Sequence, residues 1–212
     1  MKECEAGRTV LFPSRKVWYG FSMERKKIIT IGGKPGSGKS TISKRLAATL
    51  GYKHFSSGDL FRAIARERNV SVDAINRLAE SDPSIDEAVD QKLREIGGSE
   101  DEIVIDSRMA WHWIPHSFKV YLHLDLTVAA DRIYNAQNEE RFANEENAKD
   151  AREYATQLEA RLLSEAKRYM TLYQVNPYEN SHYDLVVDTF ANNPDQVERT
   201  ILAAYHTWQR EA

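Results

Sequence analysis

Hydrophobic positions along this chain follow two periods that alternate from one segment to the next. Short runs of β-branched and aromatic residues predict buried strands at residues 27–31, 52–55, 103–105, 118–124 and 185–187. Between these runs, apolar residues recur every three or four positions, which predicts helices at residues 40–50, 60–68, 72–78, 85–96, 128–134, 158–172 and 194–208. Strands that alternate with helices predict a parallel sheet between layers of helices, with ligands bound at the carboxyl ends of the strands.

Two segments follow neither period. Residues 1–25 carry scattered charges and aromatic side chains, and we predict that they form an amino-terminal extension peripheral to a domain spanning residues 26–212. An added strand or arm over the sheet edge is the alternative, and Met23 leaves a misassigned start codon open. Residues 137–152 are polar and charged without an apolar face, which predicts either a mobile lid or a solvated surface loop.

The segment between the first strand and the first helix contains the pattern G-x-x-x-x-G-K-S. Its glycines permit positive φ and close backbone approach, so successive N–H groups can converge on phosphate oxygens at the positive end of the following helix. Lys39 is expected to reach the β- and γ-phosphates, and the Ser40 hydroxyl to ligate magnesium. A glycine-rich structural turn is the alternative. The predicted nucleotide site consists of Gly33, Lys34, Pro35, Gly36, Ser37, Gly38, Lys39, Ser40 and Thr41.

The bulk composition narrows the classes of protein. A length of 212 residues with 42% hydrophobic content suits one α/β domain with a real core. The net charge of −3 argues against a nucleic-acid partner held by phosphate neutralisation. One cysteine, Cys4, excludes a disulfide framework, and no apolar run approaches the roughly 20 residues that cross a bilayer. We therefore expect a cytoplasmic protein with neither a nucleic-acid nor a membrane partner.

A second polar cluster, S-S-G-D-x-x-R, follows the second predicted strand. Ser57 and Asp59 are expected to cap the next helix, and Arg62 offers a planar fork that suits the oxygens of a phosphate. Because this helix starts at the carboxyl end of a strand, it should face the glycine-rich loop. A plain helix cap followed by a solvent-facing arginine is the alternative.

A third cluster, Asp106-Ser107-Arg108, ends the strand at residues 103–105. A carboxylate in this place suits the role of holding magnesium near a nucleotide, and Arg108 suits a second phosphate clamp. Three clusters at the ends of three strands therefore predict two phosphate sites side by side.

These clusters resemble the nucleoside monophosphate kinases, above all the archaeal-type cytidylate kinases and their bacterial relatives. The resemblance covers about residues 27–208 and includes Ala110-Trp111, an S-E-x-x-R-Y helix at residues 164–169 and the strand at residues 183–189. It implies a P-loop NTPase three-layer α/β fold with a parallel five-stranded sheet, acceptor-binding helices at residues 57–100 and the lid at residues 137–152. It also implies acceptor-binding roles for Ser57, Asp59, Arg62 and Arg108 and magnesium ligation by Ser40 and Asp106.

The lid is where the chain departs from the family. Arg132 matches an arginine that packs on the donor base in relatives, but the next lid arginine is replaced by Ala136. Arg141 is a candidate substitute, with a solvated loop as the alternative. Acidic residues of the relatives are replaced by Leu162 and Leu163. The resemblance still assigns charge stabilisation of the transferring group to Lys39, Arg132, Arg161 and Arg168.

Two further groups of side chains have competing interpretations. An aromatic cluster follows the strand at residues 103–105, and we predict core or subunit packing for it rather than base stacking. A zinc site at its histidines is disfavoured because Pro115 interrupts the helix. The cluster comprises Trp111, His112, Trp113 and His116. Asp86 and Asp90, one helical turn apart, either face the amino group of an acceptor base or solvate the helix, and we predict solvation.

Taken together, the sequence predicts ATP-dependent, magnesium-assisted phosphorylation of a nucleoside monophosphate, with CMP or dCMP as the favoured acceptor. In-line attack by a phosphate oxygen needs alignment and charge neutralisation rather than a strong base. The alternatives are another small-molecule P-loop kinase, adenylate- or shikimate-like, and a nucleotide-gated interaction module with little catalysis. We expect a monomer or a small homo-oligomer.

Overall fold

The computed structural model describes residues 10–11, 26–135 and 148–211. Its sheet has the strand order β1-β6-β5-β2-β4-β3. Five strands are parallel, which confirms the predicted sheet, and β1 adds an antiparallel pairing of Val10 with Val186 at one edge. The strands are β1 Val10–Leu11, β2 Ile28–Gly33, β3 Lys53–Ser56, β4 Ile103–Asp106, β5 Phe118–His123 and β6 Leu185–Asp188.

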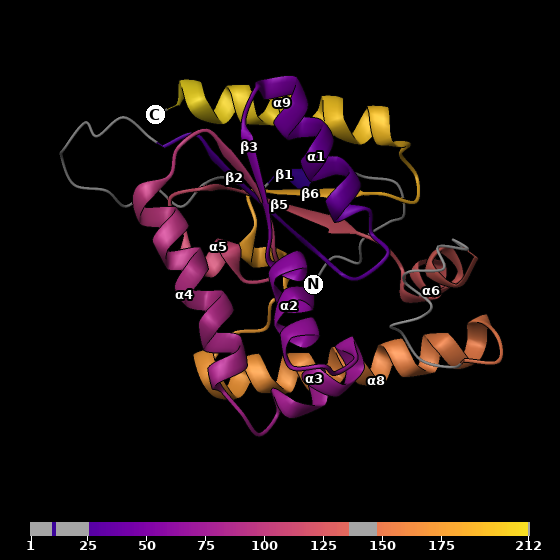
Figure 1. The fold of residues 1–212 in the computed structure, drawn as a ribbon. Coiled ribbons are helices and arrows are strands. Elements are labelled where there is room, and N and C mark those ends of the chain that lie inside the picture. Colours follow the sequence, from indigo (N-terminus) through magenta and orange to yellow (C-terminus); the bar gives the residue numbers. More distant parts are fainter. Residues whose placement is uncertain (1–9, 12–25, 136–147, 212) are drawn as a thin grey trace.

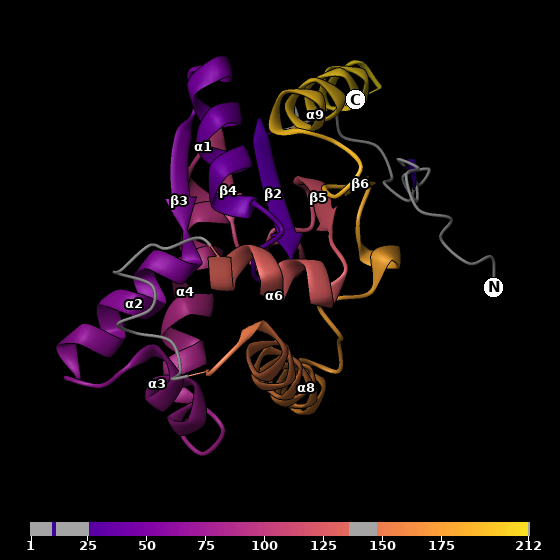
Figure 2. The same cartoon turned by 90° about the vertical axis from the view of Figure 1, so that its right-hand side faces the viewer.

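Helices cover both faces of this sheet. Figure 1 shows α1 and α9 together on one side and α4 and α5 on the other, with α8 crossing near α2 and α3. Figure 2 views α8 nearly end-on beneath α6, with which it makes an extensive contact. The helical segments are α1 Lys39–Leu50, α2 Ser57–Glu67, α3 Val72–Leu78, α4 Ser84–Ser99, α5 Ala110–Trp113, α6 Leu126–Asn135, α8 Ala151–Tyr173, the 3-10 turn η1 Asn180–His182 and α9 Pro194–Arg210.

The core has one layer on each face of the sheet, because alternate residues of a strand point to opposite faces. Ile29 and Ile31 of β2 are fully buried in the layer beneath α1 and α9. Ile28 points the other way, into a layer that also contains Leu93 of α4 and Tyr169 of α8. The end of α8 is thereby packed against the main domain, close to the carboxyl ends of the strands.

A polar network fixes α1, the helix after the glycine-rich loop, against α9. Glu198 is buried and accepts hydrogen bonds from Thr49 Oγ1 at 2.6 Å and from Arg45 Nε at 2.7 Å. Arg45 also pairs with Asp195. Since a carboxylate satisfied in this way holds its partners in one geometry, the network anchors α1 to the rest of the domain.

Several elements differ from the sequence prediction. The prediction that Ser57 and Asp59 cap α2 is wrong: Ser56 caps it by accepting from the Asp59 amide, so α2 starts at Ser57 and not at Leu60. The short helix α5 was not predicted. Helix α8 begins at Ala151, inside the predicted lid at 137–152, because Asp150 caps it and supplies a helix start.

Other predictions fall partly outside the described residues. Of the extension at residues 1–25, the structure describes the two residues of β1, which pair with the sheet edge. Of the predicted lid, residues 136–147 lie outside the described part, and Arg141 lies among them. Within the described ranges, helices do not reach the combination of length and hydrophobicity that crossing a bilayer requires.

Candidate active site

The loop from Gly33 to Gly38 joins β2 to α1 and has the backbone shape that the sequence pattern predicts. Gly36 has a φ of 77°, and a Cβ atom there would come within 2.9 Å of the Ala129 carbonyl oxygen of α6. Only glycine fits this left-handed conformation so close to another backbone. Gly38 precedes α1 and has no side chain to cap its first amides. These amides are therefore available to donate hydrogen bonds to an anion.

The side chain of Lys39 curls over this loop. Its Nζ donates to the Lys34 carbonyl oxygen at 3.0 Å. Burial lowers the pKa of Lys39 to about 8, assisted by the positive charges of Arg108 and Arg161 and opposed by Asp106 and Glu165. Lys39 therefore shares one electrostatic environment with two arginines, and an anion bound beside it would relieve the repulsion between them.

Ser40 and Asp106 meet at the start of α1 and the end of β4. The Ser40 hydroxyl donates to Asp106 Oδ2 at 2.6 Å, and Asp106 is buried. A hydroxyl and a carboxylate side by side next to the loop are the oxygen ligands that Mg²⁺ uses when substrate phosphates complete its shell. Ser40 and Asp106 therefore fit the predicted Mg²⁺ ion, which needs only one or two ligands from the protein.

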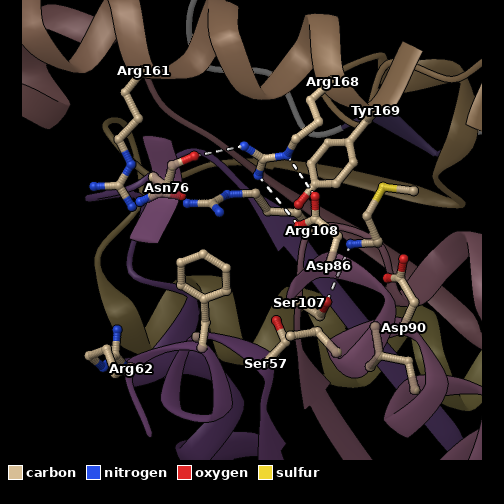
Figure 3. A pocket seen from close by; sticks show the side chains of 15 residues that line it. Ser57, Arg62, Asn76, Asp86, Asp90, Ser107, Arg108, Arg161, Arg168 and Tyr169 are labelled. Atoms are coloured by element: carbon tan, nitrogen blue, oxygen red, sulfur yellow. Dashed lines mark hydrogen bonds and ion pairs between the residues drawn. The ribbon is translucent and has the colours of Figure 1, made fainter. Parts of the chain in front are cut away.

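A pocket opens next to the loop, between α2, α4, the end of β4 and α8. Ser57, Arg62 and Arg108 line it, so three of the four predicted acceptor residues lie together. Arg161 and Arg168 reach it from α8, as Figure 3 shows. Five side chains from three separate segments therefore form one wall, and four of them are cationic.

Arg62 lies at the rim of this pocket in a local ion pair. Its guanidinium contacts the Asp59 carboxylate one helical turn earlier, and both side chains are largely exposed. Asp59 is the fourth predicted acceptor residue, and it is not among the described residues that line the pocket. Because an exposed pair of this kind contributes little to stability, Arg62 can exchange Asp59 for a ligand at small cost.

Glu165 organises the arginines and has no assigned role in the sequence prediction. It is 1% exposed and lies 3.3 Å from both Arg108 Nη1 and Arg161 Nε, and the Tyr178 hydroxyl donates to it at 2.7 Å. Burial alone would raise the pKa of Glu165, but Arg108 and Arg161 outweigh burial and lower that pKa to about 2. Glu165 is therefore ionised and holds two cations between the loop and the pocket.

One signal in the sequence points to Glu165. Arg161, Glu165 and Arg168 are spaced at i, i+4 and i+7, so they share one face of α8. The S-E-x-x-R-Y pattern contains two of them. When the pattern is placed on a helix, Glu165 lies on the same face as the two arginines and between them.

The prediction that Asp86 and Asp90 face solvent is wrong, because both side chains are buried. They are 4% and 3% exposed and line the pocket from α4. Asp86 forms an ion pair with Arg168, whose Nε lies 2.7 Å from Asp86 Oδ2 and whose Nη2 donates to Oδ1 at 3.4 Å, and Arg168 also donates to the Asn76 carbonyl oxygen at 3.3 Å. A buried carboxylate needs partners, and these partners are distant in sequence and invisible to a local pattern.

Trp111 and Trp113 of the aromatic cluster pack as predicted, whereas His116 is exposed. Trp111 is buried, and its ring stacks on His182 with centroids 4.0 Å apart. Trp113 lies under the Arg94 guanidinium at 4.4 Å and donates from its indole N–H to Asp90. Among the described residues, no group of three or more histidine, cysteine or acidic side chains is placed to hold a metal ion, His112 and His116 included.

Arg132 lies apart from these cations. It donates to the Thr189 carbonyl oxygen at 2.8 Å and so links α6 to the segment after β6. It is not among the described residues that line the pocket. Leu162, where the family resemblance leads us to expect an acidic residue, is buried between α6 and α8, whereas Leu163 is 66% exposed.

A phosphate-binding loop, a serine–aspartate pair and a pocket walled by arginines therefore adjoin one another at the carboxyl ends of parallel strands. Together they define a P-loop phosphotransferase of the nucleoside monophosphate kinase class. The chain belongs to the cytidylate kinase-like family, whose sequence model matches residues 28–191.

Curated relatives resemble the chain along most of its length. A cytidylate kinase from Halobacterium salinarum is 37% identical over 187 residues, which cover 87% of this chain and 92% of the relative. A cytidylate kinase from Methanocella arvoryzae is 36% identical over 162 residues, which cover 76% and 87% of the two chains. The predicted resemblance is confirmed.

Solved structures of lower identity confirm the predicted fold class. A gluconokinase from Sinorhizobium meliloti superposes with a TM-score of 0.56 at 15% identity and covers 89% of this chain and 97% of its own. A shikimate kinase from Acinetobacter baumannii in complex with shikimate has a TM-score of 0.52 at 18% identity and covers 84% and 92%. At such identities the likeness concerns the fold alone.

Proposed function

We propose that this protein transfers the γ-phosphoryl group of ATP to CMP or dCMP, with Mg²⁺ bound at Ser40 and Asp106. One observation carries the proposal: Arg108 and Arg161 line the acceptor pocket and also act on the pKa of Lys39 in the loop. Cations shared by a donor site and an adjoining pocket suit two phosphates that must approach each other. The cytidylate kinases among the relatives point to the same acceptors.

The chemistry divides among these side chains. The amides at the start of α1 and the Lys39 ammonium hold the triphosphate, and Mg²⁺ supplies further neutralisation of its charge. Arg62 and Ser57 hold the acceptor phosphate from the α2 side. Arg108 and Arg161 reduce the repulsion between the two anions, and Glu165 keeps both guanidiniums in place. Attack by a phosphate oxygen then requires no general base.

The far wall of the pocket favours a base with an amino group. Asp86 and Asp90 contribute carboxylate oxygens, which accept hydrogen bonds and cannot donate them when ionised. Cytosine offers an exocyclic amine, whereas uracil offers a carbonyl oxygen at the same position. An acceptor-rich wall therefore supports CMP over UMP.

A panel of monophosphates tests the proposal. We expect ATP and Mg²⁺ to support turnover of CMP and dCMP with a kcat/KM at least about tenfold above that of UMP, AMP and GMP, since one discriminating hydrogen bond to a charged group is worth about that factor or more. A coupled assay for ADP formation measures each rate. Preference for AMP or GMP would reject CMP as the acceptor while leaving the kinase class intact.

The replacements in the lid favour a second candidate, a nucleotide-binding module that transfers little. Ala136 stands where the family resemblance leads us to expect an arginine, and Leu162 contributes packing between α6 and α8 rather than charge. Calorimetric ATP binding without turnover of any monophosphate on the panel would favour this candidate.

A further inference from the structure

Asp90 occupies an unusual place on the wall of the acceptor pocket. Its side chain is 3% exposed, and each carboxylate oxygen accepts one hydrogen bond from an aromatic side chain. The Trp113 indole Nε1 donates to Oδ1 at 2.8 Å, and the Tyr173 hydroxyl donates to Oδ2. The donors come from α5 and α8, so three helices meet at this one carboxylate.

The neighbouring Asp86 has a different partner. It lies one turn earlier on α4 and pairs with the Arg168 guanidinium, so its charge is neutralised. The donors that hold Asp90 in the described structure are both neutral. A carboxylate has about four positions that accept hydrogen bonds, and the two aromatic donors occupy two of them. Asp90 therefore retains accepting capacity toward a ligand.

The surroundings leave Asp90 in need of a further donor. Burial raises the pKa of Asp90, whereas the hydrogen bonds from Tyr173 and Trp113 and the charges of Arg94 and His112 oppose that rise. Asp90 in turn contributes to a raised pKa at Asp86. A carboxylate in a buried wall that keeps unused lone pairs gains from any N–H group that a substrate brings.

We propose that Asp90 accepts the exocyclic amino group of the acceptor base, and that Trp113 and Tyr173 are positioning residues that set this selectivity. The inference rests on the proposed function, because it concerns which monophosphate occupies the pocket. Trp113 is itself held by the Arg94 guanidinium over its ring at 4.4 Å. Two rigid aromatic side chains therefore restrict the carboxylate to one orientation, with its remaining lone pairs available to a base.

Such a carboxylate discriminates in two ways. It attracts the cytosine amine, and it repels the carbonyl oxygen that uracil places at the same position. A site built to accept a hydrogen bond from its substrate rejects an analogue without the donor more strongly than an apolar pocket rejects a change in size. Selectivity is therefore decided by the orientation of Asp90, which the aromatic donors control.

The decisive experiment compares CMP with its 4-deamino analogue, the pyrimidin-2-one ribonucleoside monophosphate. We expect the protein to favour CMP by about 100-fold in kcat/KM, and Asp90→Asn to reduce that preference to about tenfold or less. The KM for ATP should stay within about twofold. An unchanged CMP preference in Asp90→Asn overturns the assignment of the amine to this carboxylate.

Conservative aromatic variants test the positioning residues. Tyr173→Phe removes only a hydroxyl, Trp113→Phe removes the indole N–H, and each should lower the CMP preference about three- to tenfold. Tyr52→Phe is the matched control, since its hydroxyl contacts Tyr205 in another part of the core at 3.3 Å and its loss should leave the preference unchanged. Preferences equal to wild type in both test variants overturn the positioning roles.

The outcomes separate this inference from the proposed function. If the unmodified protein does not phosphorylate CMP, the proposed function fails and this inference fails with it. If CMP is a good substrate and the variants keep their preference for the amino group, only the inference fails. Thermal unfolding of each variant shows whether it is folded, and Tyr173→Phe provides the test if Asp90→Asn is not.

Discussion

The donor loop and the acceptor pocket are neighbours but are built in opposite ways. The loop is one contiguous segment, Gly33 to Ser40, that presents backbone amides and one lysine. The pocket is assembled from side chains on α2, α4, α8 and the end of β4. A backbone cradle needs glycines at set spacings, whereas a side-chain pocket needs only that distant segments meet. The first leaves a pattern in the sequence, and the second leaves scattered residues.

The two regions also differ in how charge is managed. In the loop, Lys39 has a lowered pKa, and a bound anion would stabilise its charged form. In the pocket, carboxylates already offset part of the positive charge. Glu165 pairs with Arg108 and Arg161, and Asp86 pairs with Arg168. The charge of Lys39 in the loop is therefore disfavoured chiefly by burial, and the pocket is organised by ion pairs. Variants in each region should fail in correspondingly different ways.

The largest expected effect is at the loop. Lys39→Ala removes the cation that lies over the glycine-rich loop, and we expect kcat to fall by about 10³-fold or more because the proposed charge stabilisation of the transition state is lost. Steady-state kinetics with ATP and CMP measure the loss. Lys53→Ala, a lysine paired with Glu100 at the surface, is the matched control and should retain activity. Retention of most activity by Lys39→Ala would refute the assigned role.

The second effect concerns the centre of the pocket. Glu165→Gln leaves two partly buried guanidiniums without their charge partner, so we expect kcat/KM for CMP to fall about 10- to 100-fold and the free energy of unfolding to fall by about 3 kcal/mol. Chemical denaturation and kinetics measure the two losses separately. Glu198→Gln, a buried carboxylate between α1 and α9, should lose stability while the folded protein keeps its KM for CMP. Equal kinetic losses in both variants would reduce Glu165 to a structural residue.

A smaller effect is expected at the rim. Arg62→Ala should raise the KM for CMP about tenfold and leave the KM for ATP within about twofold, because a charge-assisted hydrogen bond to the acceptor phosphate is lost. Arg66→Ala, on an exposed position of the same helix, is the control and should change neither value. A larger change in the KM for ATP than for CMP would contradict the division between the two regions.

The smallest effect is a dependence on pH. The Lys39 pKa near 8 means that the free protein loses this charge as pH rises through 8. Bound phosphates favour the protonated form and raise the pKa, so ATP binding takes up a proton above pH 8. Calorimetry should show a constant ATP affinity from pH 6.5 to 7.5 and a loss approaching tenfold per pH unit above 8. Constant affinity up to pH 9.5 would mean that Lys39 stays charged without ATP.

Much of the fold could be predicted because its signals are local. All five parallel strands lie where the apolar runs indicate, and the loop has the backbone that its glycines require. Boundaries shifted where a neighbouring polar residue competes for the cap, as Ser56 does at α2. The sheet edge gained β1, which pairs through backbone groups that carry no pattern in the sequence.

The pocket was predicted only in outline. Ser57, Arg62 and Arg108 are recognisable because they follow strands whose carboxyl ends converge. Asp86 and Asp90 were misread because acidic residues one turn apart on a helix usually face water. Their partners Arg168 and Tyr173 lie 82 and 83 residues further along the chain.

By itself the sequence determined the phosphate cradle, the strands and the class of chemistry, because each depends on neighbours within one turn or one strand. Only the tertiary structure decided which carboxylates are buried, which cation each one holds and which lone pairs remain for a base. The physical reason is that the cost of burying a charge depends on partners from other helices, and helix packing alone brings those partners together.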